Sequence, residues 1–231
     1  MKAIILAAGI GSRISPITNI IPKCLIEING KKIIKRQIDS LLKVNINEII
    51  VVVGYLKNKI KSILKDSVVY IENPIYHNSN SSYSLWLAKE FIDEGFVYLN
   101  SDLIFEEGVI KKLLDSRFEN AMMIDKNINP RGDMFKVKMD GNKIIKLDKR
   151  LNLNECSAEA PGPVKFSKKG AIKIFKKLDE YISNEDKNQW CYTIFGEVAE
   201  EINLRGIYVE GLAWMEIDNV EDLKEVRKMN F

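Results

Sequence analysis

The 231-residue sequence has few of the residues that most often build catalytic and metal centres. Its only histidine, His77, excludes catalytic triads and metal clusters that depend on several histidines. The three cysteines, Cys24, Cys156 and Cys191, are widely spaced and odd in number, which indicates reduced thiols rather than a disulfide framework or a zinc site. A catalytic or metal site in this chain would therefore have to rely on side chains other than histidine and cysteine.

Long apolar runs and an excess of one charge are also absent. No apolar stretch approaches the roughly 20 residues needed to span a bilayer, so we expect no membrane partner. The net charge is only +3 and acidic and basic residues alternate along the chain, which disfavours a nucleic-acid-binding surface. Met1 and Lys2 lead directly into a strand-like run without the regions of a signal peptide, so we expect a cytoplasmic protein.

The length of the chain admits one large α/β domain or two small ones. Because no repeat and no low-complexity linker divides the chain, we predict a single domain over residues 1–231, with a core at 1–118 and a smaller lobe at 119–231. No surface pattern indicates whether chains associate.

A glycine loop follows the first apolar run of the chain. Lys2–Ala7 leads into Ala8-Gly9-Ile10-Gly11-Ser12-Arg13, and Lys23 comes shortly afterwards. Glycines adopt unusual φ angles and let backbone N–H groups approach a polyanion, and the two basic residues add charge. The third glycine of a dinucleotide-binding motif is replaced by Ile14, and the Gly-Lys-Ser/Thr end of a P-loop is missing. The basic pair favours a phosphate cradle over a plain structural turn.

Strand-like and helix-like segments alternate through the first half of the chain, which predicts a parallel sheet. The later segments predict strands added antiparallel to it, so the fold class expected is α/β, a Rossmann-like three-layer α/β/α arrangement with a mostly parallel central sheet and a small antiparallel extension. The expected strands are Lys2–Ala7, Glu48–Val53, Val68–Glu72, Phe96–Leu99, Ala121–Ile124, Met134–Met139, Lys143–Leu147 and Trp214–Ile217. The expected helices are Ile33–Leu42, Lys57–Leu64, Ser82–Phe91, Glu106–Leu114, Lys168–Ile182, Thr193–Asn203 and one that begins at Val220.

Carboxylates follow apolar runs at two distant places. Asp102 comes after a predicted strand, at the sheet edge where the glycine loop also emerges. Glu216 and Asp218 are two residues apart, so an extended strand puts them on one side together with Trp214. Mg²⁺ binds such carboxylates together with phosphate oxygens, which predicts a nucleotide–metal site. The alternatives are a turn cap for Asp102 and an N-cap of the last helix for Asp218, and the second is compatible with metal binding.

These motifs together resemble the nucleotidyltransferases that make nucleotide-diphosphate sugars and alcohols. The stretch from Asn80 to Leu85 and the short chain look most similar to the choline-phosphate cytidylyltransferase type and its inositol-phosphate and aminoethylphosphonate relatives. The residues that carry the resemblance are Leu6–Arg13, Pro16, Pro22-Lys23, Val53-Gly54-Tyr55, Asn73-Pro74, Tyr83-Ser84-Leu85, Ser101-Asp102 and Glu216-Ile217-Asp218.

The resemblance implies a Mg²⁺-dependent transfer of a nucleoside monophosphate, with CTP favoured, to a small phosphorylated alcohol such as choline phosphate, with release of pyrophosphate. Residues 1–118 would then bind the nucleotide, and 119–231 would form the acceptor side and carry the second metal motif. Catalysis is assigned to Arg13, Lys23, Asp102 and Asp218. Asp102, Glu216 and Asp218 are assigned to Mg²⁺. The nucleotide is assigned to Leu6, Ala8, Gly9, Gly11, Ser12, Gly54, Tyr55, Asn80, Ser81 and Ser82.

The acceptor side is predicted from aromatic and acidic residues. Tryptophan and tyrosine at Trp86, Trp190, Tyr192 and Trp214 suggest an aromatic box for a quaternary ammonium, although such rings are more often core. Glu159, ahead of Gly162, matches a pair that sugar-specific relatives carry, so a uridylyl-, thymidylyl- or cytidylyltransferase for sugar 1-phosphates stays an alternative. A nucleotide-binding regulatory domain without catalysis is the other alternative, and retention of both metal positions speaks against it.

Overall fold

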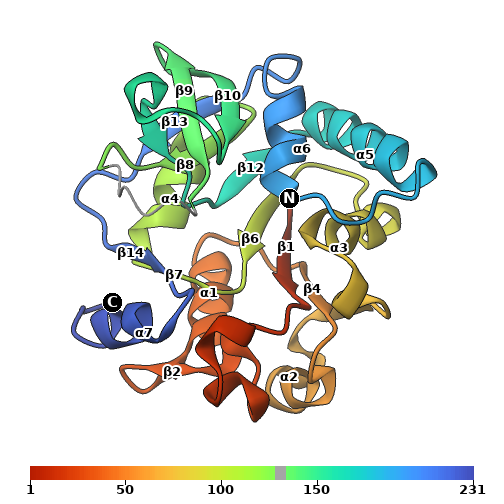
Figure 1. Ribbon diagram of the computed structural model, residues 1–231, viewed down its shortest axis with the longest axis vertical. Helices are drawn as coiled ribbons and strands as arrows, with labels where there is room; N and C mark the ends of the chain where they lie inside the picture. The colour runs from red at the N-terminus through yellow and green to blue at the C-terminus, as the bar shows by residue number, and fades with distance from the viewer. Residues whose placement is uncertain (128–133) are drawn as a thin grey trace.

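The computed structural model describes residues 1–127 and 134–231 (Figure 1). Within these residues, ten strands form one sheet that takes strands from both halves of the chain. Their order across the sheet is β11-β9-β10-β13-β8-β12-β6-β1-β4-β5. Their bounds are β1 Lys2–Ala7, β4 Ile49–Val53, β5 Val69–Glu72, β6 Phe96–Asn100, β8 Ala121–Ile124, β9 Lys136–Asp140, β10 Lys143–Asp148, β11 Ala158–Glu159, β12 Val164–Phe166 and β13 Arg205–Tyr208.

The first half of the chain supplies the parallel part of the sheet, as predicted. Strand β1 pairs in parallel with β4 and with β6, and β4 pairs in parallel with β5. Side chains of β1 alternate between the two faces: Ile4 and Leu6 join one hydrophobic cluster, and Ile5 and Ala7 join the other. A strand buried on both faces has no polar side to alternate with, which explains its continuous apolar run.

Helices cover both faces of the sheet (Figure 1), which confirms the three-layer prediction. Helices α3, α5 and α6 pack into one hydrophobic cluster, and α1, α2 and α4 pack into the cluster on the opposite face. A seventh helix, α7, lies against a third, smaller cluster. The bounds are α1 Ile33–Leu42, α2 Lys57–Leu64, α3 Ser81–Leu87, α4 Gly108–Asp115, α5 Lys168–Ser183, α6 Cys191–Val198 and α7 Val220–Val226.

The second half of the chain makes the sheet mixed. Strand β12 pairs antiparallel with β6 and with β8, and β9 and β10 form a hairpin with Gly141 at φ 56° in its turn. Strand β13 runs parallel to β8 and was not predicted. Helix α6 is shorter than predicted, because the chain turns after Ala199 and Asn203 takes a left-handed conformation at φ 54°. The division near residue 118 stays a prediction.

Two small sheets complete the edge at which the site lies. Strand β7 (Leu103–Phe105) pairs antiparallel with β14 (Trp214–Glu216), and β2 (Glu27–Ile28) pairs with β3 (Lys31–Lys32). Asn29 and Gly30, both at positive φ, form the turn of the second pair, as is typical of a two-residue hairpin. None of the helices described has the length and apolarity to cross a membrane.

The last helix is capped by Asn219 rather than by Asp218, the alternative that the sequence left open. Asn219, not Asp218, is the N-cap of α7, and its side chain accepts the backbone N–H of Asp222. The Asp222 carboxylate in turn accepts the backbone N–H groups of Asp218 and Asn219. The capping box therefore leaves the Asp218 carboxylate outside the helix cap, so the structure does not support the N-cap alternative for Asp218.

Candidate active site

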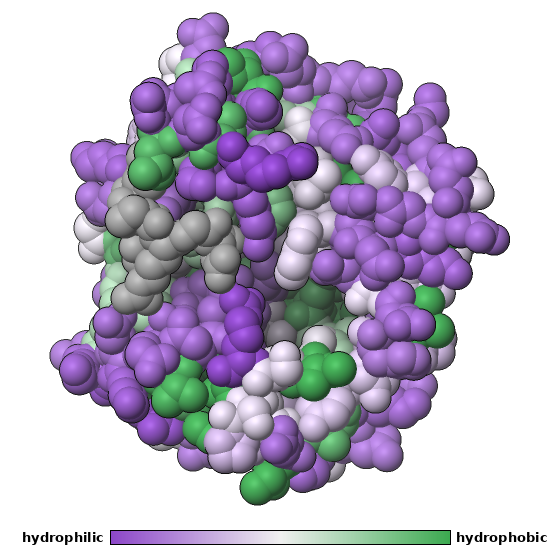
Figure 2. Space-filling view, viewed as in Figure 1, coloured by the Kyte–Doolittle hydropathy of each residue, from purple (hydrophilic) through white to green (hydrophobic). Residues whose placement is uncertain are grey.

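A cavity of about 320 Å³ opens at the carboxyl ends of β1 and β6. It is seen as a hollow near the middle of the face in Figure 2, with hydrophilic residues along much of its border. The glycine loop, the start of α3, the end of β14 and the start of α6 all contribute to its lining. Ligands of open α/β sheets bind at this edge, so the cavity lies where the sequence places the site.

The glycine loop forms one wall of the cavity. Gly11 has φ 67°, a left-handed conformation, and a Cβ there would lie 3.2 Å from a methyl carbon of Thr18. The Thr18 hydroxyl donates a hydrogen bond of 2.8 Å to the Gly11 carbonyl and fixes the bend. A Cβ on Gly9 would meet no atom within 4 Å, so the backbone there borders open space. The loop therefore exposes main chain to a ligand, as a phosphate cradle requires.

Gly54 lies behind the glycine loop and does not line the cavity. A Cβ at this position would lie 2.7 Å from the Tyr76 Cβ and 2.9 Å from the Ala8 carbonyl oxygen. The backbone N–H of the next residue, Tyr55, donates to that same carbonyl over 3.1 Å. Neither Gly54 nor Tyr55 lines the cavity, whereas Tyr76 does. Gly54 thus permits the close approach of the loop to the end of β4.

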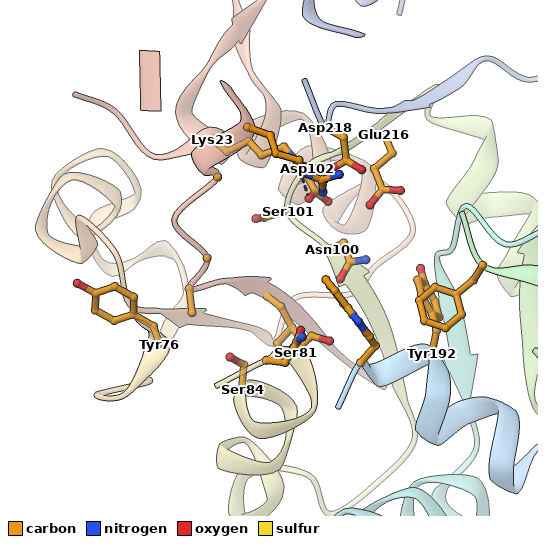
Figure 3. Close-up of a pocket in the computed structure, with 18 of the residues that line it drawn as sticks. Lys23, Tyr76, Ser81, Ser84, Asn100, Ser101, Asp102, Tyr192, Glu216 and Asp218 are labelled. Atoms are coloured by element: carbon orange, nitrogen blue, oxygen red, sulfur yellow. Dashed lines mark hydrogen bonds and ion pairs between the residues drawn. The ribbon is translucent and has the colours of Figure 1, made fainter. Parts of the chain in front are cut away.

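Three carboxylates converge opposite the loop (Figure 3). Asp102, Glu216 and Asp218 each offer an oxygen atom, and these oxygens lie within 4.8 Å of one another. Asp102 follows β6, and the pairing of β7 with β14 sets Glu216 opposite Leu103. The backbone N–H of Ile217 also donates to the Asp102 carbonyl over 3.1 Å. Pairing between two distant segments therefore brings the acids together.

Two cations balance this acidic cluster. The Lys23 Nζ lies 2.8 Å from Asp102 Oδ2 and 3.0 Å from Asp218 Oδ1, and an Arg13 guanidinium nitrogen lies 2.9 Å from the same Asp218 oxygen. Burial alone would lower the pKa of Lys23, but the charges of Asp102 and Asp218 outweigh it and raise that pKa above its usual value. Lys23 is therefore held in its charged form.

Glu216 lies half-buried beside the other two acids. Burial, together with the charges of Asp102 and Asp218, raises the pKa of Glu216 to about 8. The Oδ1 atom of Asp102 is buried and accepts no hydrogen bond from the residues that the structure describes. A buried oxygen without a partner beside two more carboxylates suits a hard divalent cation such as Mg²⁺. The donor set thus fits the metal that the sequence predicts.

The start of α3 forms the wall opposite the acids. The Asn80 side chain caps this helix by accepting the backbone N–H of Ser81 over 2.7 Å. The Ser81 hydroxyl accepts the backbone N–H of Cys191 over 2.8 Å, and the backbone N–H groups of Asn80 and Ser82 donate to the carbonyls of Lys187 and Gln189. Segments 80–82 and 187–191 are thereby joined. Ser82 is fully buried and does not line the cavity.

Aromatic side chains form the end of the cavity nearest α6. Trp190 and Tyr192 line it, together with Phe135. Trp214, expected beside them, does not line it; its indole N–H donates to Asp125 over 2.7 Å. Trp86 also lies outside the cavity lining and donates its indole N–H to an acid on α5. The aromatic box that the sequence suggests is therefore only partly assembled.

Glu159 is placed away from the cavity surface. It is 2% exposed, and its backbone pairs with that of Asp125. The structure thus offers no contact between this carboxylate and a ligand in the cavity. The following Gly162 has φ 60°, and a Cβ on it would lie 2.3 Å from the Tyr192 hydroxyl oxygen. Gly162 therefore permits the close packing of Tyr192 against the backbone.

Most of the residues predicted for the site line one cavity. They are Leu6, Ala8, Gly9, Gly11, Ser12, Arg13, Lys23, Asn80, Ser81, Asp102, Trp190, Tyr192, Glu216 and Asp218. Gly54, Tyr55, Ser82, Glu159 and Trp214 do not line it.

Several polar residues of the lining were not predicted as site residues, among them Asn100 and Lys149. Asn100 ends β6, where its Oδ1 accepts the Tyr98 hydroxyl over 2.6 Å, and Lys149 follows β10. Asn100 lies two residues before Asp102 on the same strand end, a signal that could have found it; no pattern around Lys149 points to a cavity.

Comparison with known proteins agrees with this geometry. The model of the MobA-like NTP transferase domain family matches residues 3–133. The CTP:phosphoglutamine cytidylyltransferase of Campylobacter jejuni is 32% identical over 97% of this chain and 98% of its own length. The choline-phosphate cytidylyltransferase of Streptococcus pneumoniae is 29% identical over 99% of this chain and 98% of its own.

Solved structures share the fold over nearly the whole chain. The CTP:phosphocholine cytidylyltransferase from Streptococcus pneumoniae has a TM-score of 0.79 at 26% identity, covering 98% of this chain and 97% of that one. The inositol-1-phosphate CTP transferase from T. maritima has a TM-score of 0.81 at 21% identity, covering 98% of this chain and 94% of that one. At that lower identity the likeness establishes the fold alone.

Proposed function

Because the chain belongs to the nucleotidyltransferase family with the MobA-like NTP transferase domain, we propose that it transfers CMP from CTP to a small phosphorylated acceptor and releases pyrophosphate. The observation that carries the proposal is the position of the carboxylate cluster. Asp102, Glu216 and Asp218 face the glycine loop across one cavity, with the Lys23 ammonium between them. In this cavity, groups suited to binding a polyphosphate and a divalent cation lie beside a positively charged side chain.

The metal proposed for this cluster is Mg²⁺. Asp102, Glu216 and Asp218 would hold it, and the unpartnered Oδ1 of Asp102 supports this assignment. When bound, Mg²⁺ would offset phosphate charge and orient the triphosphate. A bound divalent cation would favour the ionised form of Glu216 and would balance the third carboxylate, which Lys23 and Arg13 do not pair with.

The chain's own side chains would supply the remaining positive charge. Arg13, on the glycine loop, suits phosphate oxygens because its guanidinium is planar and forked. Lys23 is proposed to contact the α-phosphate, where negative charge moves onto the leaving group during the reaction. Backbone N–H groups around Gly9 and Gly11 would hold the triphosphate, while Ala8 and Ser81 would contact the base.

The proposed reaction is an in-line displacement at the α-phosphorus. An oxygen of the acceptor phosphate forms the new bond to phosphorus, while the bond to the oxygen that bridges to the β-phosphate breaks and pyrophosphate leaves. A phosphomonoester has a second pKa of about 6 and is largely dianionic at neutral pH, so no general base is needed. His77 does not line the cavity, which agrees with this mechanism.

The activities of the two similar proteins support both CTP and a phosphorylated acceptor. The proteins from Campylobacter jejuni and Streptococcus pneumoniae are cytidylyltransferases whose acceptors are phosphoglutamine and choline phosphate, respectively. For this chain we propose CTP as the nucleotide and a compact phosphate or phosphonate as the acceptor.

Pyrophosphate release tests the proposal directly. The purified protein is incubated with CTP or UTP and with choline phosphate, inositol phosphate, phosphoglutamine or glucose 1-phosphate, with Mg²⁺ or with EDTA. We expect release that depends on CTP, acceptor and Mg²⁺. Turnover only with a sugar 1-phosphate would favour the sugar nucleotidyltransferase alternative, and nucleotide binding without any release would favour a regulatory domain.

Asp102→Asn, with Asp115→Asn as its control, links the activity to this cavity. Asp115 is the last residue of α4 and pairs with Lys111 at the surface, outside the cavity. Loss of pyrophosphate release in the first variant and retention in the second would support the assignment. Equal activity in both would contradict it.

A further inference from the structure

A resident lysine occupies the aromatic end of the cavity. The Lys149 Nζ lies 4.5 Å from the centroid of the Trp190 ring and 5.1 Å from that of the Phe135 ring. Both rings line the cavity, and Lys149 lines it as well. The lysine backbone is held in place, because its carbonyl accepts a hydrogen bond of 2.6 Å from the Lys136 Nζ. An ammonium group near two aromatic faces is the arrangement of a cation–π site that is already filled.

The charges around this end of the cavity make a second cation unfavourable. Among the described residues that line the cavity, the only acids are Asp102, Glu216 and Asp218. These form the cluster assigned to the metal, and two of them already pair with Lys23. A cationic headgroup placed against the Trp190 ring would therefore meet the Lys149 ammonium, while Glu216, the acid without an ion pair to Lys23, already faces the charge of Lys149 and is assigned to the metal.

We infer that Lys149 takes the place on the aromatic wall that a cationic headgroup would need, so that the end of the acceptor remote from its phosphate is uncharged or anionic. The inference rests on the proposed function and narrows its substrate class. It separates this chain from an enzyme that prefers choline phosphate, whose quaternary ammonium requires a free aromatic face or a carboxylate. An acceptor with a hydroxyl, amide or carboxylate group at that end could accept a hydrogen bond from the Lys149 ammonium.

A pair of phosphate esters that differ only in charge tests the inference. Choline phosphate and 3,3-dimethylbutyl phosphate have the same shape, because a neutral carbon replaces the quaternary nitrogen in the second compound. With CTP and Mg²⁺, kcat/KM of the wild-type protein should be about tenfold or more higher for the neutral ester. A dissociation constant from calorimetric titration gives the same ratio if either ester is bound without being turned over.

Lys149→Met removes the charge while keeping a flexible apolar chain of similar length. In this variant the preference should shift toward choline phosphate by about tenfold, since the aromatic faces become free for its ammonium. Lys187→Met is the matched control: the Lys187 Nζ lies 5.7 Å from the centroid of the Tyr83 ring, and neither residue lines the cavity. The control should keep the wild-type ratio.

Two results would overturn the inference. One is a wild-type protein that uses or binds choline phosphate as well as the neutral ester, or that binds neither. The other is an equal loss for both esters in Lys149→Met, which would mean that Lys149 contacts the phosphate common to both. Failure of the proposed function is a distinct result, because no nucleotide and acceptor pair would then release pyrophosphate while the ratio of dissociation constants remains measurable.

Discussion

Replacing Lys23 with methionine removes the cation that lies between two carboxylates of the acidic cluster. At 2.8 Å from Asp102, and with an effective dielectric constant of about 20, one such ion pair is worth about 6 kcal/mol before desolvation. Removing one partner of a buried pair costs about 3–5 kcal/mol, because an uncompensated charge remains. Asp102 and Asp218 are 25% and 20% exposed, so we expect a loss near 3 kcal/mol in the free energy of unfolding.

Urea unfolding in EDTA measures this loss. Lys43→Met serves as the control, because Lys43 pairs with Glu107 at the surface and both side chains are more than half exposed, so its removal should change stability by less than about 1 kcal/mol. Saturating Mg²⁺ should restore most of the stability of Lys23→Met, since another cation then balances the acids. Turnover should nevertheless fall about a hundredfold or more. If Lys23→Met were as stable as the wild-type protein in EDTA, or if it folded and turned over at a near-normal rate, the reasoning would be refuted.

Further expectations concern the metal, pH and thiols. Asp102→Asn should raise the Mg²⁺ concentration required for half-maximal pyrophosphate release by about tenfold or more; unchanged activity at limiting Mg²⁺ would rule Asp102 out as a ligand. Because the pKa of Glu216 is raised from its usual 4.5 to about 8 in the folded protein, the free energy of unfolding in EDTA should fall by up to about 5 kcal/mol as the pH rises from 4.5 to 8. Glu216→Gln should abolish that fall, and an unchanged pH profile would contradict the assignment. Burial raises the pKa of Cys24 and Cys191 to about 12, so a thiol reagent at pH 8 should modify one thiol, Cys156, in the native protein and three after unfolding; three fast native reactions would contradict this.

The parallel core and the acidic cluster were predictable because their signals are local. The continuous apolar run of β4 and the glycine loop after β1 each identify an element from adjacent residues. The end of a parallel strand fixes where Asp102 emerges, and its distance from the loop follows from the topology. The two-residue spacing of Glu216 and Asp218 was likewise sufficient to place them together.

The acceptor side was less predictable because its geometry depends on long-range pairing. Strands β11 and β12 contain two and three residues, too few to show a periodicity, yet β12 joins the two halves of the sheet. Trp214 precedes the acidic motif at the spacing expected for the cavity, but a hydrogen bond to Asp125 holds its indole elsewhere. Lys149 stands between charged neighbours, and only the fold brings it over the Trp190 ring.

The hydrogen bonds that join residues 80–82 to residues 187–191 have a consequence for engineering. Ser81 is the side chain proposed to contact the base, and its hydroxyl also fixes the backbone beside Trp190. Selectivity for nucleotide and for acceptor therefore cannot be altered independently by exchanging either stretch with that of a relative. A chimera that imports both stretches together would preserve their shared contacts, whereas one that imports a single stretch would disturb recognition of both reactants.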